Sequence, residues 1–214
     1  MILEAKNKPP FIHFGFNQIA KTIIEKIQGS SEIVAKYTTG KCPVYYKNTG
    51  VGYFIASTLL PPECVINGKQ TSSSRETTIN FENNDLRNIF HSIIVSSTFF
   101  LYYHARSNCR DLNPSDITTF HFPKSLLTET RLIHLSEKLQ DNLVKTSWFQ
   151  TRNQKQTGEV KIQSFTVSLS KDIIDEIDKV LAEYFKFSSE ELDFVMNYDI
   201  KYRMGKELEG DEEE

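Results

Sequence analysis

Residues 84–122 have the sequence NDLRNIFHSIIVSSTFFLYYHARSNCRDLNPSDITTFHF, in which the most apolar run of the chain leads into a polar turn. The spacing of the apolar residues predicts a helix from about Asn84 to Ala105. The stretch Ile89 to Tyr103 is shorter than a bilayer-spanning helix and is interrupted by a histidine, three serines and a threonine. We therefore expect a helix buried inside a protein, not one that lies in a membrane.

The polar turn after this helix contains charged and amide side chains within eight residues: Arg106, Asn108, Arg110, Asp111 and Asn113. Arginine and amide groups can bind phosphates and the edges of bases in DNA. A structural role is the alternative, in which Arg110 pairs locally with Asp111. Asn113 then caps a short helix that Pro114 begins. Both interpretations stay open at this stage.

A helix and a small sheet are expected before residue 84. Phe16 to Gln28 has apolar residues at helical spacing, and Gly29 follows as a stop signal. From Glu32 to Asn80, short β-branched and aromatic runs alternate with turn signals, of which Asn67-Gly68 is typical of a hairpin. This texture predicts a largely antiparallel sheet.

More helices are expected after residue 122. The predicted elements are an amphipathic helix at Leu126–Phe149, a polar loop at Thr151–Gly158, a strand at Val160–Val167, a helix at Lys171–Phe185, and a helix that Ser188 opens with a capping box and that ends near Met204. The predicted fold class is α+β, with a small, mostly antiparallel sheet packed with helices and a helical segment at the C-terminus. The predicted division is an N-terminal helical segment at 1–30, an α/β DNA target recognition domain at 31–168, a helical appendage at 169–206 and an acidic, disordered tail at 207–214.

The bulk composition fits a soluble globular protein, because 39% of the 214 residues are hydrophobic and 25% are charged. The net charge is −3, but the tail 207–214 includes six acidic residues and no basic one, so the rest of the chain has a net charge of +3. The three cysteines show no metal-ligand spacing, and the N-terminus has no signal-peptide core. These features favour a cytoplasmic protein.

Two further segments are candidates for DNA contact. A small-polar loop is predicted after the hairpin signal, formed by Lys69, Gln70, Thr71, Ser72, Ser73, Ser74 and Arg75, in which serines with arginine and lysine suit phosphate oxygens. An exposed, flexible loop is the equally favoured alternative. Tyr45-Tyr46-Lys47 is the third candidate, although two adjacent tyrosines on a strand more often mean that one is packed and the other exposed.

Signals for catalysis and metal binding are missing. No glycine-rich loop has the spacing that holds a nucleotide, and no histidine pair has zinc spacing. No acidic cluster suggests a phosphodiester-cleaving metal site. His91 and His104 fall on the apolar helix, and we expect them to be hydrogen-bonded core or boundary residues rather than catalytic ones.

Three segments resemble one protein family. SKDIIDEIDKVLAEYFKFSSEELDFVMNYDIKYRMG at 170–205 is similar to the end of many adenine-specific DNA methyltransferases of bacterial type II and type IIG restriction–modification systems. FLYYHARSNCRDLNPSDITTFHFP at 100–123 and PVYYKNTGVGYF at 43–54 resemble earlier segments of the same proteins, in the same order. In that family these segments form the target recognition domain, similar to the TaqI-like C-terminal specificity domain.

The resemblance implies recognition without catalysis. In the family, the preceding catalytic domain has an S-adenosylmethionine loop and an Asn-Pro-Pro-Tyr/Phe motif that holds a flipped adenine. Lys8-Pro9-Pro10-Phe11 resembles that motif only superficially, because Lys8 stands where the amide is needed. We therefore expect no enzyme activity from the chain alone, no metal and no cofactor of its own, with S-adenosylmethionine bound by a separate catalytic partner.

The leading hypothesis is a sequence-specific recognition module that binds double-stranded DNA together with a methyltransferase or restriction subunit. The expected DNA-contacting residues are Lys47, Ser72, Ser73, Ser74, Arg75, Arg106, Arg110 and Asn113. Loops such as 67–76 and 150–158 are where specificity is expected to vary. The alternatives are a protein–protein assembly module, or a non-catalytic remnant, that no longer binds DNA, and, least favoured, an enzyme with an unrecognised site.

Overall fold

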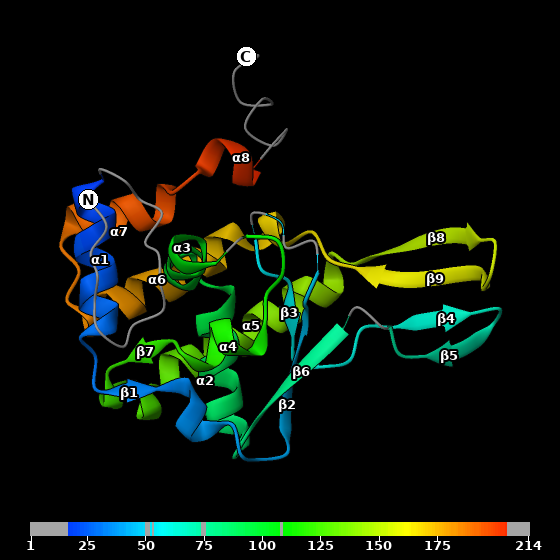
Figure 1. The fold of residues 1–214 in the computed structure, drawn as a ribbon, viewed down its shortest axis with the longest axis horizontal. Coiled ribbons are helices and arrows are strands. Elements are labelled where there is room, and N and C mark those ends of the chain that lie inside the picture. Colours follow the sequence, from blue (N-terminus) through cyan, green and yellow to red (C-terminus); the bar gives the residue numbers. More distant parts are fainter. Residues whose placement is uncertain (1–16, 50–51, 53, 74–75, 108, 205–214) are drawn as a thin grey trace.

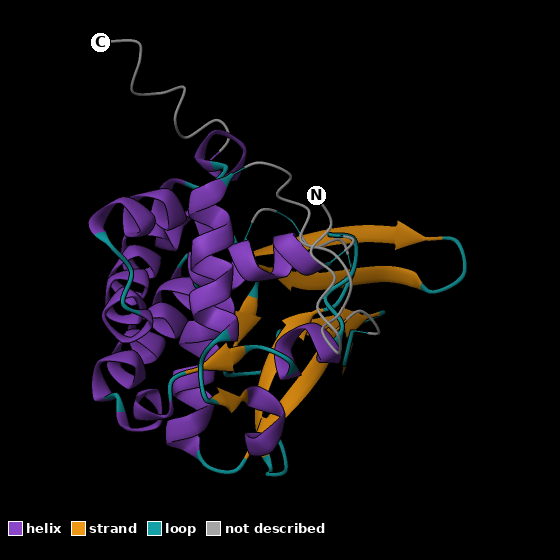
Figure 2. Ribbon diagram, turned by 60° about the vertical axis from the view of Figure 1, so that its left-hand side comes forward, coloured by secondary structure: helices purple, strands orange, loops and turns teal. Residues whose placement is uncertain are grey.

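The structure, a computed structural model, describes residues 17–49, 52, 54–73, 76–107 and 109–204. Helices gather on one side of the molecule, strands lie on the other, and two hairpins extend away from the body (Figures 1 and 2). The sheets are antiparallel throughout the described residues. The predicted α+β class is confirmed.

The body consists of helices that pack on one another. The α-helices are α1 (Gln18–Gln28), α2 (Asn84–Val95), α3 (Ser97–Arg106), α4 (Pro114–Thr118), α5 (Thr130–Lys145), α6 (Lys171–Phe185), α7 (Ser189–Asn197) and α8 (Ile200–Met204). Short 3₁₀ helices are η1 (Val34–Tyr37), η2 (Lys124–Thr128) and η3 (Val167–Ser170). Buried side chains of α1, α2, α3, α5, α6 and α7 form one hydrophobic cluster. The segments predicted at 1–30 and 169–206 thus contribute to the same core as the rest, and the predicted domain boundaries stay predictions.

The strands form three sheets. They are β1 (Glu32–Ile33), β2 (Cys42–Lys47), β3 (Ser57–Thr58), β4 (Cys64–Ile66), β5 (Lys69–Thr71), β6 (Glu76–Phe81), β7 (His121–Phe122), β8 (Trp148–Gln154) and β9 (Gly158–Ser164). The strand orders are β1-β7, β3-β2-β6, which we call the body sheet, and β5-β4-β9-β8, which we call the projecting sheet. The predicted helix at 16–28 and the predicted Asn67-Gly68 hairpin are both confirmed, the latter with positive φ angles of 49° and 77°.

The helix predicted from Asn84 to Ala105 is interrupted. Ser96 has an extended backbone, with φ −63° and ψ 154°, and its hydroxyl caps α3 by accepting the N–H of Phe99 at 3.0 Å. The buried carboxylate of Asp178 in α6 accepts the backbone N–H groups of Ser97 at 3.0 Å and Thr98 at 2.9 Å. These acceptors satisfy N–H groups that a helix start leaves open inside the core. The prediction of one continuous helix was wrong. The carboxylate that accepts the first N–H groups of α3 belongs to Asp178, a residue far away in the sequence, so the local pattern does not show it.

His91 in α2 is a hydrogen-bonded core residue, as expected. Its ring nitrogens lie 2.8 Å from the Ser136 hydroxyl in α5 and 3.0 Å from the Ser57 carbonyl in β3. Burial lowers the pKa of His91 to about 4. His104 lies at the boundary of the core, where its ring is hydrogen-bonded to the Tyr198 hydroxyl and stacked on Phe100.

The body sheet packs on α2 with one face and leaves the other open. Val44 and Tyr46 of β2 are buried in the core, whereas Tyr45 is partly exposed. This alternation confirms that one of the paired tyrosines is packed. In the antiparallel register, Tyr45 lies opposite Thr58 and Thr78, and cross-strand partners of this kind share a face of a sheet.

The projecting sheet corrects two predictions. The helix predicted at 126–149 starts at Thr130 and ends at Lys145. The segment predicted as a polar loop at 151–158 is mostly strand, because β8 and β9 form a hairpin. The sequence of β8 shows no alternation of apolar and polar residues, because side chains on both faces of this strand are mostly exposed. None of the described residues of this sheet belongs to the hydrophobic cluster of the body.

Both C-terminal helices start where the sequence predicts, but the second one ends earlier than predicted. The helix at Lys171–Phe185 and the capping box of Ser188 and Glu191 are confirmed. The helix predicted to reach Met204 ends at Asn197, because Asp199 has a positive φ of 52° and a separate short helix follows. Within the ranges that the structure describes, no helix has the length and apolarity needed to span a bilayer. The tail 207–214 and the segment Lys8 to Phe11 lie outside the described residues.

Candidate nucleic-acid interface

A groove with a volume of about 440 Å³ lies between the body sheet and the projecting sheet. From the body sheet and its neighbours it is lined by Tyr45, Tyr46, Lys47, Ala56, Thr58 and Glu76. From the projecting sheet and its flanks it is lined by Pro62, Cys64, Ile66, Ser72, Ser73, Gln150, Arg152, Gln154, Thr157, Val160, Ile162, Gln163, Ser164 and Phe165. We call this site the groove. Its lining combines apolar side chains with polar and charged ones.

The antiparallel registers explain which side chains face the groove. In the projecting sheet, Val160 of β9 lies opposite Ile66 of β4 and Arg152 of β8, so these three share one face. In the body sheet, Lys47 of β2 lies opposite Glu76 of β6. The groove therefore has basic side chains from both sheets and one carboxyl group from the body sheet.

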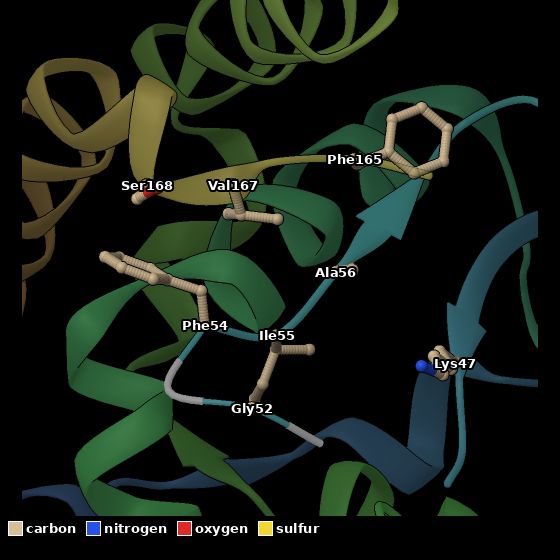
Figure 3. Close-up of a pocket in the computed structure, with 8 residues that line it drawn as sticks. All are labelled: Lys47, Gly52, Phe54, Ile55, Ala56, Phe165, Val167 and Ser168. Carbon is tan, nitrogen blue, oxygen red and sulfur yellow. The ribbon is translucent and has the colours of Figure 1, made fainter. Parts of the chain in front are cut away.

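A smaller cavity of about 250 Å³ adjoins the groove and shares Lys47, Ala56 and Phe165 with it. Gly52, Phe54, Ile55, Val167 and Ser168 complete its lining. Figure 3 shows Lys47 across the cavity from Phe54 and Val167. Lys47 thus lies where the two openings meet.

Three residues predicted from sequence to contact DNA lie together at the groove. Lys47, Ser72 and Ser73 all line it, although the serines follow β5 and the lysine ends β2. The N–H of Glu76 donates to the Ser73 carbonyl at 3.2 Å, which fixes the turn beside the groove. Ser74 and Arg75, like Asn108, lie outside the described residues.

The donor-rich turn at 106–113 borders the end of β2 rather than lining the groove. The N–H of Leu112 donates to the Asn48 carbonyl at 2.9 Å, and Thr49 pairs with Asp111. This contact places the turn next to the strand that ends at Lys47.

The side chains of this turn have both local and exposed positions. The Arg106 guanidinium lies over the Tyr102 ring, 4.8 Å from its centroid. Arg110 has a side chain that is 84% exposed and lies 3.9 Å from the Asp111 carboxylate. The N–H of Asn113 donates to the Asp116 carboxylate at 2.7 Å, and Asn113 is the N-cap of the helix that Pro114 begins, as expected. The structural interpretation is thus confirmed for Asn113, while Arg110 is exposed enough to bind a partner as well.

Sequence reasoning named Lys69 but missed the other basic side chains of the projecting sheet. Lys69, Arg152, Lys155 and Lys161 are exposed there, with Glu159 as the acidic residue. The Lys161 ammonium lies 4.4 Å from the centroid of the partly exposed Phe149 ring. The density of lysine, arginine and glutamine in the segments 67–76 and 150–158 was the available signal. What the sequence could not give is that these two segments form neighbouring hairpins.

Comparison of the chain with protein-family models, with curated proteins and with solved structures gives no match. In the part of the chain that the structure describes, no three His, Cys, Asp or Glu side chains are grouped so that they could bind a metal ion.

Proposed function

We propose that the chain is a sequence-specific recognition module for double-stranded DNA that acts with a separate catalytic subunit of a restriction–modification system. The observation that carries this proposal is the projecting sheet. It extends from the body (Figure 1). Its described residues contribute nothing to the hydrophobic cluster, and they include exposed basic and amide side chains.

The charge of the projecting sheet supports contact with phosphates. The whole chain has a net charge of −3. The two hairpins, in contrast, have one acidic residue, Glu159, and four basic ones: Lys69, Arg152, Lys155 and Lys161. Basic residues gathered on one protruding element are the electrostatic footprint of a nucleic-acid-binding surface. A two-stranded β-ribbon also fits the width of the DNA major groove.

The amide side chains support sequence recognition. Gln150 and Gln154 of β8 line the groove on the same face of the projecting sheet as Arg152. Amides pair in bidentate fashion with adenine. Such side chains on a hairpin can distinguish base pairs, whereas lysines bind the backbone of any sequence.

The proposed catalytic partner rests on the resemblance of 43–54, 100–123 and 170–205 to adenine-specific DNA methyltransferases. Methyl transfer and S-adenosylmethionine binding would belong to that partner. Lys47 lines the groove beside the projecting sheet, and the exposed Arg110 belongs to the turn that borders the end of β2, so both would add phosphate contacts from the body.

An assembly module is the second candidate, and one observation favours it. The large apolar side chains of Val144 at the end of α5 and Trp148 at the start of β8 are each 48% exposed. They lie where the projecting sheet leaves the body, and apolar groups in such a position suit contact with another protein.

A salt-titrated binding assay on mixed duplexes tests the proposal. We expect the chain to bind duplexes at low salt. The logarithm of the binding constant should fall linearly with the logarithm of the salt concentration, with a slope of several units. K69A/R152A removes two positive charges from one face of the projecting sheet, because Lys69, Ile66, Val160 and Arg152 are successive cross-strand partners, and should reduce that slope by about 2. K179A/K201A removes two exposed lysines from α6 and α8 and serves as the matched control. Absence of binding at low salt, even with the catalytic subunit present, would sink the proposal.

A further inference from the structure

Glu76 is an unusual residue in the groove. It is the acidic side chain among the described lining residues, where Lys47 and Arg152 are the basic ones. It is the first residue of β6, directly opposite Lys47 of β2, and its N–H is held by the Ser73 carbonyl. The backbone of Glu76 is therefore fixed on both sides, and its side chain belongs to the face that looks into the groove.

Within the part of the chain that the structure describes, the Glu76 side chain makes no hydrogen bond or ion pair that would offset its burial. It is partly buried, and burial raises its pKa to about 7. Among the described residues, no charged or hydrogen-bonding neighbour counters the effect of burial. A partly buried carboxyl group without donors costs free energy, so its position at the groove suggests a donor that arrives with a ligand.

The rest of the lining indicates the kind of ligand. Tyr45, Ile66, Val160 and Ile162 offer apolar surface that suits the flat face of a base. Lys47 and Arg152, from the two opposite sheets, suit the phosphates on either side of it. The volume of about 440 Å³ is in the range of a small-molecule site, which suits a single nucleotide and not a whole duplex.

We propose that Glu76 is a specificity-determining residue that accepts a hydrogen bond from the exocyclic amino group of an adenine or cytosine presented to the groove. This inference rests on the DNA recognition proposed above and names the group that would select a base. An ionised carboxylate only accepts hydrogen bonds, so it favours bases with an amino group over those that present oxygen at the same place.

The ionisation of Glu76 can be tested by changing the pH, provided that the groups around it in the groove do not titrate in the same range. Lys47 from β2 and Arg152 from β8 are the basic side chains in the same lining. Burial raises the pKa of the Cys64 thiol in β4 above its usual value of 9, and the nearby Glu76 raises it further. Burial also raises the pKa of Tyr46 to about 12. Of the described lining residues whose pKa is shifted, Glu76 is therefore the one whose pKa falls between pH 6 and pH 8.

Selection from a randomised duplex pool tests the inference without a known target site. Bound duplexes are sequenced for the wild type, E76Q, E76L and the control E159Q, whose carboxylate is on the opposite face of the projecting sheet. The wild type should favour adenine or cytosine at one position by on the order of tenfold. E76L should abolish that preference and E76Q should weaken it, while other positions and the E159Q profile stay unchanged.

A second measurement uses pH. From pH 6 to pH 8 the wild-type preference at that position should grow as Glu76 ionises, because the protonated acid can also donate to oxygen acceptors. The E76Q preference should not change with pH. Thermal melting of each variant shows that it is folded.

The possible failures are distinguishable. If the wild type binds no duplex at low salt, the proposed function fails and this inference fails with it. If the wild type is selective but E76L, folded as shown by melting, selects the same sequences, DNA recognition stands and the role of Glu76 is overturned. The same holds if the wild-type preference does not respond to pH.

Discussion

Asn67 and Glu159, 92 residues apart, are joined by two hydrogen bonds. The N–H of Asn67 donates to the Glu159 carbonyl at 2.9 Å, and the Asn67 side-chain oxygen accepts the N–H of Glu159 at 3.0 Å. The Asn67 amide also donates to the Thr157 carbonyl at 2.8 Å. The turn of the β4-β5 hairpin is thus hydrogen-bonded to the turn of the β8-β9 hairpin, and the two hairpins form one sheet.

Asn67→Ala should loosen this junction. It removes two side-chain hydrogen bonds worth about 1 kcal/mol each and places alanine at a positive φ of 49° that asparagine tolerates better. Amide hydrogen exchange should accelerate at 64–71 and 148–164 and stay unchanged in the helices. Asn153→Ala, an exposed change in β8, is the control. Unaltered exchange in the hairpins would show that the junction does not depend on this side chain.

Two glycine substitutions separate backbone strain from steric contact. Gly158 and Gly68 have φ angles of 78° and 77°, so alanine costs roughly 1 kcal/mol of strain at either position. A Cβ at Gly158 would lie 2.3 Å from the Asn67 side-chain oxygen, whereas a Cβ at Gly68 meets nothing within 4 Å. Gly158→Ala should therefore lower duplex affinity more than Gly68→Ala. Equal affinities in the salt-titrated assay would mean that the relative position of the hairpins does not affect binding.

His91 should make stability depend on pH. Because its pKa falls from 6.5 in the unfolded chain to about 4 in the fold, the unfolded state binds more protons between these values. The neutral His91 ring therefore makes its full contribution to the free energy of unfolding above pH 6.5. This contribution is lost as pH falls towards 4, by about 3 kcal/mol in all.

Denaturant unfolding of the wild type and His91→Gln across pH 4–7 measures this dependence. Glu76 contributes with the opposite sign, since its raised pKa favours the fold at low pH, so the difference between the two proteins is the quantity to compare. His134→Gln, at a 79% exposed position, should follow the wild type. A His91→Gln difference that is constant with pH would contradict the assignment.

Arg203 should hold α8 on the body. Its guanidinium donates to the Ser97 hydroxyl at 3.0 Å and lies 4.3 Å and 5.1 Å from the ring centroids of Phe54 and Phe100. Arg203→Ala removes these contacts and should lower stability by about 2 kcal/mol, with faster proteolysis at 198–204. Lys201→Ala, an exposed change in the same helix, should leave both unchanged. Equal proteolysis of the two variants would indicate that α8 is held by other contacts.

Local signals predicted much of the fold. The helix α6 was predicted with its bounds, and the capping residues Asn113 and Ser188 and the hairpin turn at Asn67-Gly68 were also predicted. Each depends on residues within a few positions of one another, so the sequence pattern contains the cause. The predictions failed where the cause was distant, as at Ser96, where Asp178 supplies acceptors for the start of α3.

The candidate site was predicted only in parts. Lys47, Ser72 and Ser73 were named separately, and the structure brings them to one groove. Arg152 and Glu76 were not named, because β8 lacks the alternation of a half-buried strand and Glu76 has no motif around it.

By itself the sequence determined the helices with an apolar face, the capped helix starts, the tight turns and an excess of polar and basic residues in two segments. Those properties depend on short-range spacing and on side-chain chemistry. Only the tertiary structure decided that α2 and α3 are separate helices, that the two polar segments form one projecting sheet, and that a groove with Glu76 lies between that sheet and the body. These features depend on hydrogen bonds and packing between residues some 30 to 110 positions apart, which no local pattern specifies.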